Sequence, residues 1–268
     1  MPLTRRASIA SKSRSNHTRR PETHVPLTTF LDFPNRLFII KLMPATTRVY
    51  YYWLLLSVFL GATPAQLPAQ TNTGIAKWEA EIKAFEKSDL TNPPPKGAIL
   101  FVGSSSIRKW TTLAHDFPGK QVINRGFGGS GIADSTAFAG RIIFPYQPKM
   151  IVLYAGDNDL AAGKSSEQVV ADYRAFVRKV HHRLPKTRIA FISIKPSPSR
   201  WRLKEKIRAV NQQIAGMKAG WLVFIDVYSS MLDADGRPRA DLFLSDGLHP
   251  NAKCYQLWAS LINPWLDR

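Results

Sequence analysis

The chain has 268 residues, of which 44% are hydrophobic and 21% are charged. This composition is typical of a folded globular protein and excludes a wholly disordered or fibrous chain. The net charge of +18 is spread thinly, with +7 over residues 1–70 and +11 over residues 71–268. Because basic and aromatic residues do not alternate in the second part, we expect no nucleic acid partner. The single cysteine, Cys254, excludes an internal disulfide.

The beginning of the chain differs in composition from the rest. Residues 1–42 are rich in Arg, Ser, Thr and Pro, which predicts a disordered or non-native extension. Residues 43–69, beginning at Met43, have the order of a secretory signal peptide: one arginine, then an apolar stretch of 14 residues at 49–62, then small residues and prolines. We therefore interpret Met43 as the true initiator of an exported protein, periplasmic or extracellular.

The apolar stretch 49–62 is short for a membrane helix, which needs about 20 residues. We expect cleavage after Ala65 or Ala69, which would leave no stable membrane span. The alternative is an anchor formed by an uncleaved 49–62 segment.

Residues 73–268 alternate short apolar runs with amphipathic stretches, which predicts a single α/β domain. Five buried parallel strands are expected at 98–102, 121–124, 150–156, 188–194 and 221–227. Helical spacing predicts helices at 75–87, 106–113, 131–143, 166–184, 200–218 and 251–263. This alternation predicts a three-layer α/β/α sandwich around a central five-stranded parallel sheet. Ligands of such sheets bind at the carboxyl ends of the strands, so functional residues are expected in the loops that follow them.

The loops after the first two strands carry serines and glycines. In Gly103-Ser104-Ser105-Ser106 a hydroxyl stands at a strand-to-helix turn, where a helix N-terminus stabilises negative charge, although a plain cap and turn fits equally. The loop after the second strand matches G-x-G-x-x-G over 126–131. A dinucleotide-binding oxidoreductase that uses Gly126–Gly131 is therefore an open alternative. That alternative leaves Ser105 unexplained.

Two later loops carry acidic, amide and imidazole side chains. Asn158, within Gly156–Asp159 after the third strand, could donate to an oxyanion or form a solvated turn. Asp246 and His249 are three residues apart and can meet on one turn, where the carboxylate would orient the imidazole as a base, although such a pair taken alone is more often structural. Pro250 follows directly and is predicted to be the first residue of the closing helix.

In chain order these blocks resemble the SGNH (GDSL-like) hydrolase superfamily of esterases and lipases, over roughly residues 97–263. The residues that carry the resemblance are Ser105, Gly129, Asn158, Asp246 and His249. The resemblance implies the flavodoxin-like SGNH hydrolase fold. It also implies Ser105 as nucleophile, His249 as base and Asp246 as the residue that orients it. The implied oxyanion hole consists of the Ser105 and Gly129 amides with the Asn158 side chain. Ser104 stands where the family's G-D-S motif has Asp.

The implied activity is that of a serine-type carboxylic ester hydrolase that needs no cofactor and no metal. We expect a small-molecule, glycan or lipid ester as substrate, and export together with the lack of a long apolar lid favours short or carbohydrate-linked acyl groups. A lysophospholipase or thioesterase, and a non-catalytic binding domain of the same fold, stay as alternatives. Arg200 and Trp201 follow the fourth strand and are candidates for the substrate pocket. Asp233–Gly236 lacks the later acidic ligands of a calcium loop and is predicted to be a turn. The sequence indicates no oligomeric state.

Overall fold

The computed structural model describes residues 73–267, so the expected extension at 1–42 and the expected signal peptide at 43–69 lie outside the described residues. The five expected strands are present as β1 (Ile99–Gly103), β2 (Val122–Gly126), β3 (Met150–Tyr154), β4 (Arg188–Ile192) and β5 (Leu222–Ile225). They form one parallel sheet in the order β2-β1-β3-β4-β5. This is the strand order of flavodoxin-like sheets, so the predicted fold is confirmed.

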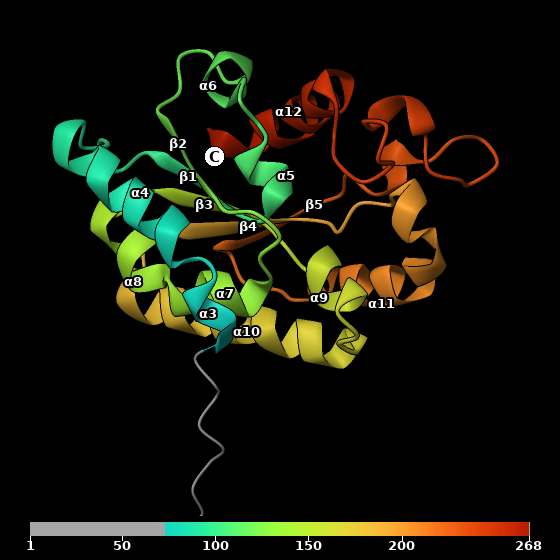
Figure 1. Ribbon diagram of the computed structural model, residues 1–268, viewed down its shortest axis with the longest axis horizontal. Helices are drawn as coiled ribbons and strands as arrows, with labels where there is room; N and C mark the ends of the chain where they lie inside the picture. Colours follow the sequence, from blue (N-terminus) through green and yellow to red (C-terminus); the bar gives the residue numbers. More distant parts are fainter. Residues whose placement is uncertain (1–72, 268) are drawn as a thin grey trace, which may run out of the picture. The chain divides into compact units, whose positions relative to one another are not determined.

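Helices cover both faces of the sheet (Figure 1). One face carries α4 (Glu79–Thr91), α7 (Ile132–Ala137), α8 (Ala139–Ile142), α10 (Ser166–Arg183) and α11 (Lys204–Ala215). The other carries α5 (Ser105–Arg108), α6 (Leu113–Asp116) and α12 (Ala252–Leu266). The remaining short helices are α3 (Thr73–Ala76), η1 (Phe144–Tyr146), α9 (Asp157–Ala161), η2 (Pro198–Leu203), η3 (Ser229–Met231) and η4 (Ala240–Leu242). None of the helices within 73–267 combines the length and the apolar character needed to cross a membrane.

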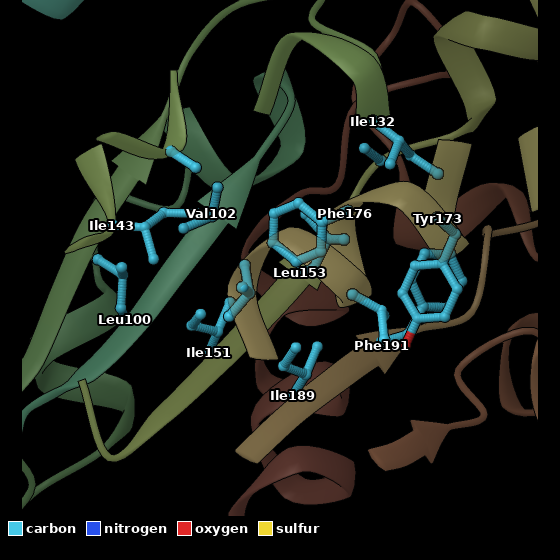
Figure 2. Packing of buried hydrophobic residues seen from close by; sticks show 14 of the residues in the cluster. Leu100, Val102, Ile132, Ile143, Ile151, Leu153, Tyr173, Phe176, Ile189 and Phe191 are labelled. Atoms are coloured by element: carbon cyan, nitrogen blue, oxygen red, sulfur yellow. The ribbon is translucent and has the colours of Figure 1, made fainter. Parts of the chain in front are cut away.

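The strands are buried on both faces, which is why they appear in the sequence as continuous apolar runs. Successive side chains of β1 alternate between the two layers, with Leu100 and Val102 in one core and Phe101 in the other. Figure 2 shows the first of these cores, where Tyr173 of α10 lies beside Phe191 of β4 with ring centroids 4.9 Å apart. Both faces of the central sheet are therefore packed against helices, and the loops at the carboxyl ends of its strands start from well-packed residues.

Four of the expected helices are interrupted, and the first of them, expected at 75–87, is divided into α3 and α4 by a turn at residues 77–78. The one predicted at 106–113 is divided into α5 and α6, and the one at 131–143 into α7 and α8. At each of these last two breaks a large side chain turns into the core, namely Trp110 and Phe138, which are 1% and 4% exposed. The helix predicted at 200–218 begins as the 3-10 helix η2, with a proline at its first position, and continues as α11.

The closing helix was predicted at 251–263 with Pro250 as its opening residue, and it begins slightly later. Pro250 is not its first residue; it forms an isolated bridge with Phe243, and α12 starts at Ala252. Asn251 is the cap, because its side-chain oxygen accepts a hydrogen bond from the Cys254 amide at 3.1 Å. An Asn side chain satisfies a free amide of the first turn, which a proline cannot do.

The acidic segment at Asp233–Gly236 is a turn, as predicted. The Asp233 carboxylate accepts from the amides of Asp235 and Arg237 at 3.0 and 2.8 Å. Leu232 and Pro238 pair across it. The carboxylate is therefore occupied by its own turn.

Candidate active site

Three of the four loops that carry the predicted site follow the neighbouring strands β2, β1 and β3. In the parallel register Gly103 at the end of β1 lies beside Gly126 of β2 and Tyr154 of β3. A Cβ at Gly103 would lie 1.9 Å from the Tyr154 carbonyl oxygen, so the turn out of β1 requires glycine. The serine, glycine and asparagine loops therefore leave the sheet side by side.

Ser105, His249 and Asp246 form a hydrogen-bonded line. His249 Nε2 lies 3.0 Å from Ser105 Oγ, and His249 Nδ1 lies 2.5 Å from Asp246 Oδ2. Ser105 is the first residue of α5, whereas the acid and the imidazole lie in the loop before α12. Tyr255 of α12 donates to the Ser106 carbonyl at 2.9 Å, which fixes α12 against α5. Residues 144 positions apart are thereby brought into contact.

The Asp246 carboxylate is held by its own turn. Its Oδ1 accepts from the Leu248 and His249 amides at 2.8 and 2.9 Å. The hydrogen bond from the His249 ring, with these amides, holds the pKa of Asp246 well below its usual range. The carboxylate is therefore ionised near neutral pH, as a group that orients an imidazole and stabilises its charged form must be.

The predicted oxyanion donors lie on adjoining loops. Gly129 has a φ of +70°, a conformation that favours glycine. Asn158, on α9, donates from Nδ2 to the Ser130 carbonyl at 3.1 Å. Ser130 Oγ in turn lies within hydrogen-bond distance of the carbonyls of Gly103 and Phe127, at 3.2 and 3.0 Å, and its single hydrogen can be donated to either or shared between them. Hydrogen bonds thus connect the loops that follow β1, β2 and β3.

The glycines of the 126–131 loop have packing partners within the protein. A Cβ at Gly126 would lie 2.3 Å from the Arg108 amide nitrogen, and one at Gly131 would lie 2.4 Å from an Asp159 oxygen. The first turn of α7 is already occupied by carboxylates, because Gly131 N donates to Asp134 and Ile132 N donates to Asp159. Two carboxylates at this helix N-terminus would repel a pyrophosphate, so the loop does not suit a dinucleotide.

Comparison with known families identifies the protein class. The model of the GDSL-like lipase/acylhydrolase family matches residues 101–257, which is more than half of the chain. The chain belongs to this family. It is accordingly a hydrolase of the kind that acts on acyl esters, and the dinucleotide alternative is set aside. No curated protein matches the chain closely enough to serve as a relative.

Solved structures share the family's fold with this GDSL-like protein. A GDSL-like lipase from Bacteroides thetaiotaomicron is 21% identical with a TM-score of 0.61, and the match covers 70% of this chain and 98% of that one. A carbohydrate esterase family 3 protein from Talaromyces cellulolyticus is 19% identical with a TM-score of 0.51, covering 63% and 95%. At these identities the likeness demonstrates the fold alone.

Arg200 and Trp201, the candidates for the substrate pocket of the GDSL-like protein, have different surroundings. The Arg200 guanidinium is directed at the site loops: Nη2 donates to Asn158 Oδ1 at 2.8 Å, and Nη1 lies 3.0 Å from Asp157 Oδ2. Trp201 lines an open cleft of about 700 Å³ between η2, α11 and the segment that follows β5, and Lys204 lies over its ring. None of Ser105, Asp246 and His249 lines this cleft.

Sequence reasoning missed a buried lysine in this GDSL-like fold. Lys195 follows β4 and is 1% exposed, and its Nζ contacts Asp157 Oδ2 at 2.9 Å and the Tyr154 hydroxyl at 2.8 Å. It also reaches Ser106 Oγ at 3.3 Å. The signal that could have revealed it is the single cation in the apolar run "FISIKP", just beyond a predicted strand.

Proposed function

We propose that this protein is an exported serine ester hydrolase that forms an acyl-enzyme on Ser105. The observation that carries the proposal is the line of hydrogen bonds from Asp246 through His249 to Ser105, at 2.5 and 3.0 Å. Nucleophile, base and orienting acid in mutual contact are the parts that acyl transfer through a serine requires.

In the proposed mechanism His249 Nε2 takes the proton of Ser105 Oγ while the oxygen attacks the ester carbonyl. Asp246 accepts from Nδ1, which keeps Nε2 free of a proton in the resting enzyme and stabilises the imidazolium that forms. His249 then protonates the departing alcohol. Water, activated by the same imidazole, hydrolyses the acyl-enzyme and restores Ser105.

The negative charge of the tetrahedral intermediate would be held by the Ser105 and Gly129 amides and the Asn158 side chain. Asn158 Nδ2 has one hydrogen on the Ser130 carbonyl, which leaves its second hydrogen for the oxyanion. Loss of one such donor typically lowers kcat by about 10²–10³.

For the substrate we propose a short acyl ester, including one carried by a carbohydrate. Export would bring the enzyme to such esters, and a carbohydrate esterase is among the proteins that share its fold. The competing hypothesis is that this protein hydrolyses a lysophospholipid or a thioester, because a GDSL-like lipase also shares its fold. Turnover of acetylated sugars, lysophospholipids and acyl-thioesters, compared by kcat/KM, distinguishes them.

The first experiment replaces the nucleophile. Ser105→Ala is expected to lower kcat/KM for p-nitrophenyl acetate by about 10⁴-fold or more, because no other group can form the acyl-enzyme. A fluorophosphonate probe should label the wild type at Ser105 and leave the variant unlabelled. Circular dichroism should show the same fold in both.

The result that would contradict the proposal is equally direct. Full hydrolysis by Ser105→Ala would remove Ser105 from the mechanism. A wild type that is folded, is unlabelled and turns over none of the three substrate groups would favour the non-catalytic binding domain.

A further inference from the structure

A cluster of buried charges lies behind the candidate site. Asp157, Lys195 and Arg200 meet at a single oxygen, Asp157 Oδ2, with Lys195 Nζ at 2.9 Å and Arg200 Nη1 at 3.0 Å. The three side chains are 5%, 1% and 16% exposed. Burial would raise the pKa of Asp157, but the two cations outweigh it and lower the pKa, so the carboxylate is ionised.

Such a cluster is not an obvious source of stability. Removing three charges from water is costly, and two cations here share one carboxylate. Buried charges of this kind are common at functional sites. The cluster reaches the candidate site at two points: Lys195 at Ser106, directly after the nucleophile, and Arg200 at Asn158.

The contact between Arg200 and Asn158 determines which way the amide faces. A guanidinium can only donate, so the atom of Asn158 that lies 2.8 Å from Nη2 must be the carbonyl oxygen. A backbone carbonyl can only accept, so the atom that lies 3.1 Å from the Ser130 oxygen must be the NH₂ nitrogen. Both partners favour the same orientation, in which the NH₂ group faces the loop that carries Gly129. The opposite orientation would direct a carbonyl oxygen at the developing oxyanion.

We propose that Arg200 is a positioning residue: anchored by Asp157, its guanidinium holds the Asn158 amide with its NH₂ group toward the oxyanion. This inference rests on the proposed function and deepens it. It gives Arg200 a role different from the substrate contact expected from the sequence. Its guanidinium acts through Asn158, and substrate binding should therefore be almost insensitive to its loss.

The test is a double-mutant cycle on p-nitrophenyl acetate hydrolysis. Asn158→Ala should lower kcat by about 10²–10³, and Arg200→Met should lower kcat by about tenfold or more with KM within about twofold of wild type. The variant with both substitutions should be no slower than Asn158→Ala alone, because Arg200 then has no amide to hold. Arg202→Met, an exposed arginine on the same helix η2, is the matched control and should keep wild-type kinetics.

Arg200→Lys guards against loss of folding. It retains a positive charge near Asp157 but replaces the two-pronged guanidinium, which contacts Asp157 and Asn158 together, by a single ammonium. The same loss of kcat with an unchanged thermal unfolding midpoint is expected. A second readout does not depend on turnover: the ¹H–¹⁵N side-chain signal of Asn158, identified by its loss in Asn158→Ala, should shift in Arg200→Met and stay in place in Arg202→Met.

Three outcomes would overturn the inference: a raised KM with unchanged kcat, losses that multiply in the double variant, or an Asn158 signal that does not move in Arg200→Met. Failure of the proposed function looks different. A wild type that hydrolyses none of the esters and is not labelled at Ser105 would overturn the esterase proposal, and the Asn158 signal would still decide whether Arg200 holds the amide.

Discussion

Ser104 is buried, although it stands next to the proposed nucleophile in the sequence. It occupies the position of the family's aspartate, directly before Ser105, yet it is 1% exposed. Its Oγ has no hydrogen-bond partner among residues 73–267, although its amide donates to the Tyr154 carbonyl at 3.0 Å. A buried hydroxyl without a partner costs free energy of folding and contributes nothing to the line of catalytic contacts.

Ser104→Ala is therefore expected to be harmless or stabilising. Removing the unpaired hydroxyl should raise the free energy of unfolding by about 1 kcal/mol and leave kcat/KM within about threefold of wild type. Urea denaturation and p-nitrophenyl acetate kinetics measure the two quantities. A drop in activity comparable to that of Ser105→Ala would mean that the hydroxyl takes part in the reaction.

Candidate site residues could be predicted from the sequence where residue type and chain order indicate their role. Ser105, Asp246 and His249 could be proposed because their blocks, in chain order after predicted strands, resemble those of the SGNH hydrolase superfamily. Lys195 could not, because its meaning comes from burial against Asp157, and burial of a single cation is set by tertiary packing.

At the scale of elements, the buried charges of Asp157, Lys195 and Arg200 join α9 to the segment after β4. Asn211 of α11 pairs with both the amide and the carbonyl of Ile194, at 2.8 and 2.9 Å, and so fixes the residue before Lys195. Asp157 lies at the start of α9, after Gly156, whose φ of +114° suits glycine. Removing the carboxylate would leave two buried cations without a counter-charge.

Asp157→Asn is expected to lower the free energy of unfolding by about 3–5 kcal/mol near neutral pH. The pKa of Asp157 is lowered in the folded protein, so its contribution is complete above the unfolded pKa and is lost as pH falls through the folded value. The deficit of the variant should thus be constant from about pH 8 to pH 5 and should shrink below about pH 4. Denaturant unfolding of both proteins across this range measures it; a deficit that shrinks already above pH 5 would contradict the assignment.

Elements were predicted with uneven success, for physical reasons. The five strands were found because strands buried on both faces have uninterrupted apolar sequences. Breaks such as the one at Trp110 were missed, because helical spacing does not reveal where a side chain leaves the helix to fill the core. The capping role of Asn251 was missed, because a cap depends on which residue has an extended backbone.

At the scale of the whole molecule, the described residues 73–267 hold a five-stranded sheet with a hydrophobic core on each face, and they include every residue of the candidate site. We expect a chain that begins at Gln70, as cleavage after Ala69 would produce, to fold and to keep the kcat/KM of the full-length protein within about twofold. Kinetics of that chain check the first expectation, and N-terminal sequencing of the protein from its native host checks the cleavage. A mature chain that begins near Pro2 would refute the signal peptide.

The contact between α12 and α5 bears on the order in which the candidate site is assembled during synthesis. Tyr255 and Ser106 are 149 positions apart, and the loop that carries His249, the proposed base, leads directly into α12. During synthesis the nucleophile emerges long before the imidazole, and contacts between distant parts of a chain form late. If the proposed mechanism holds, Ser105 stays inert in the growing polypeptide until α12 has docked. The proposed esterase activity would then appear only after α12 has been made and has folded.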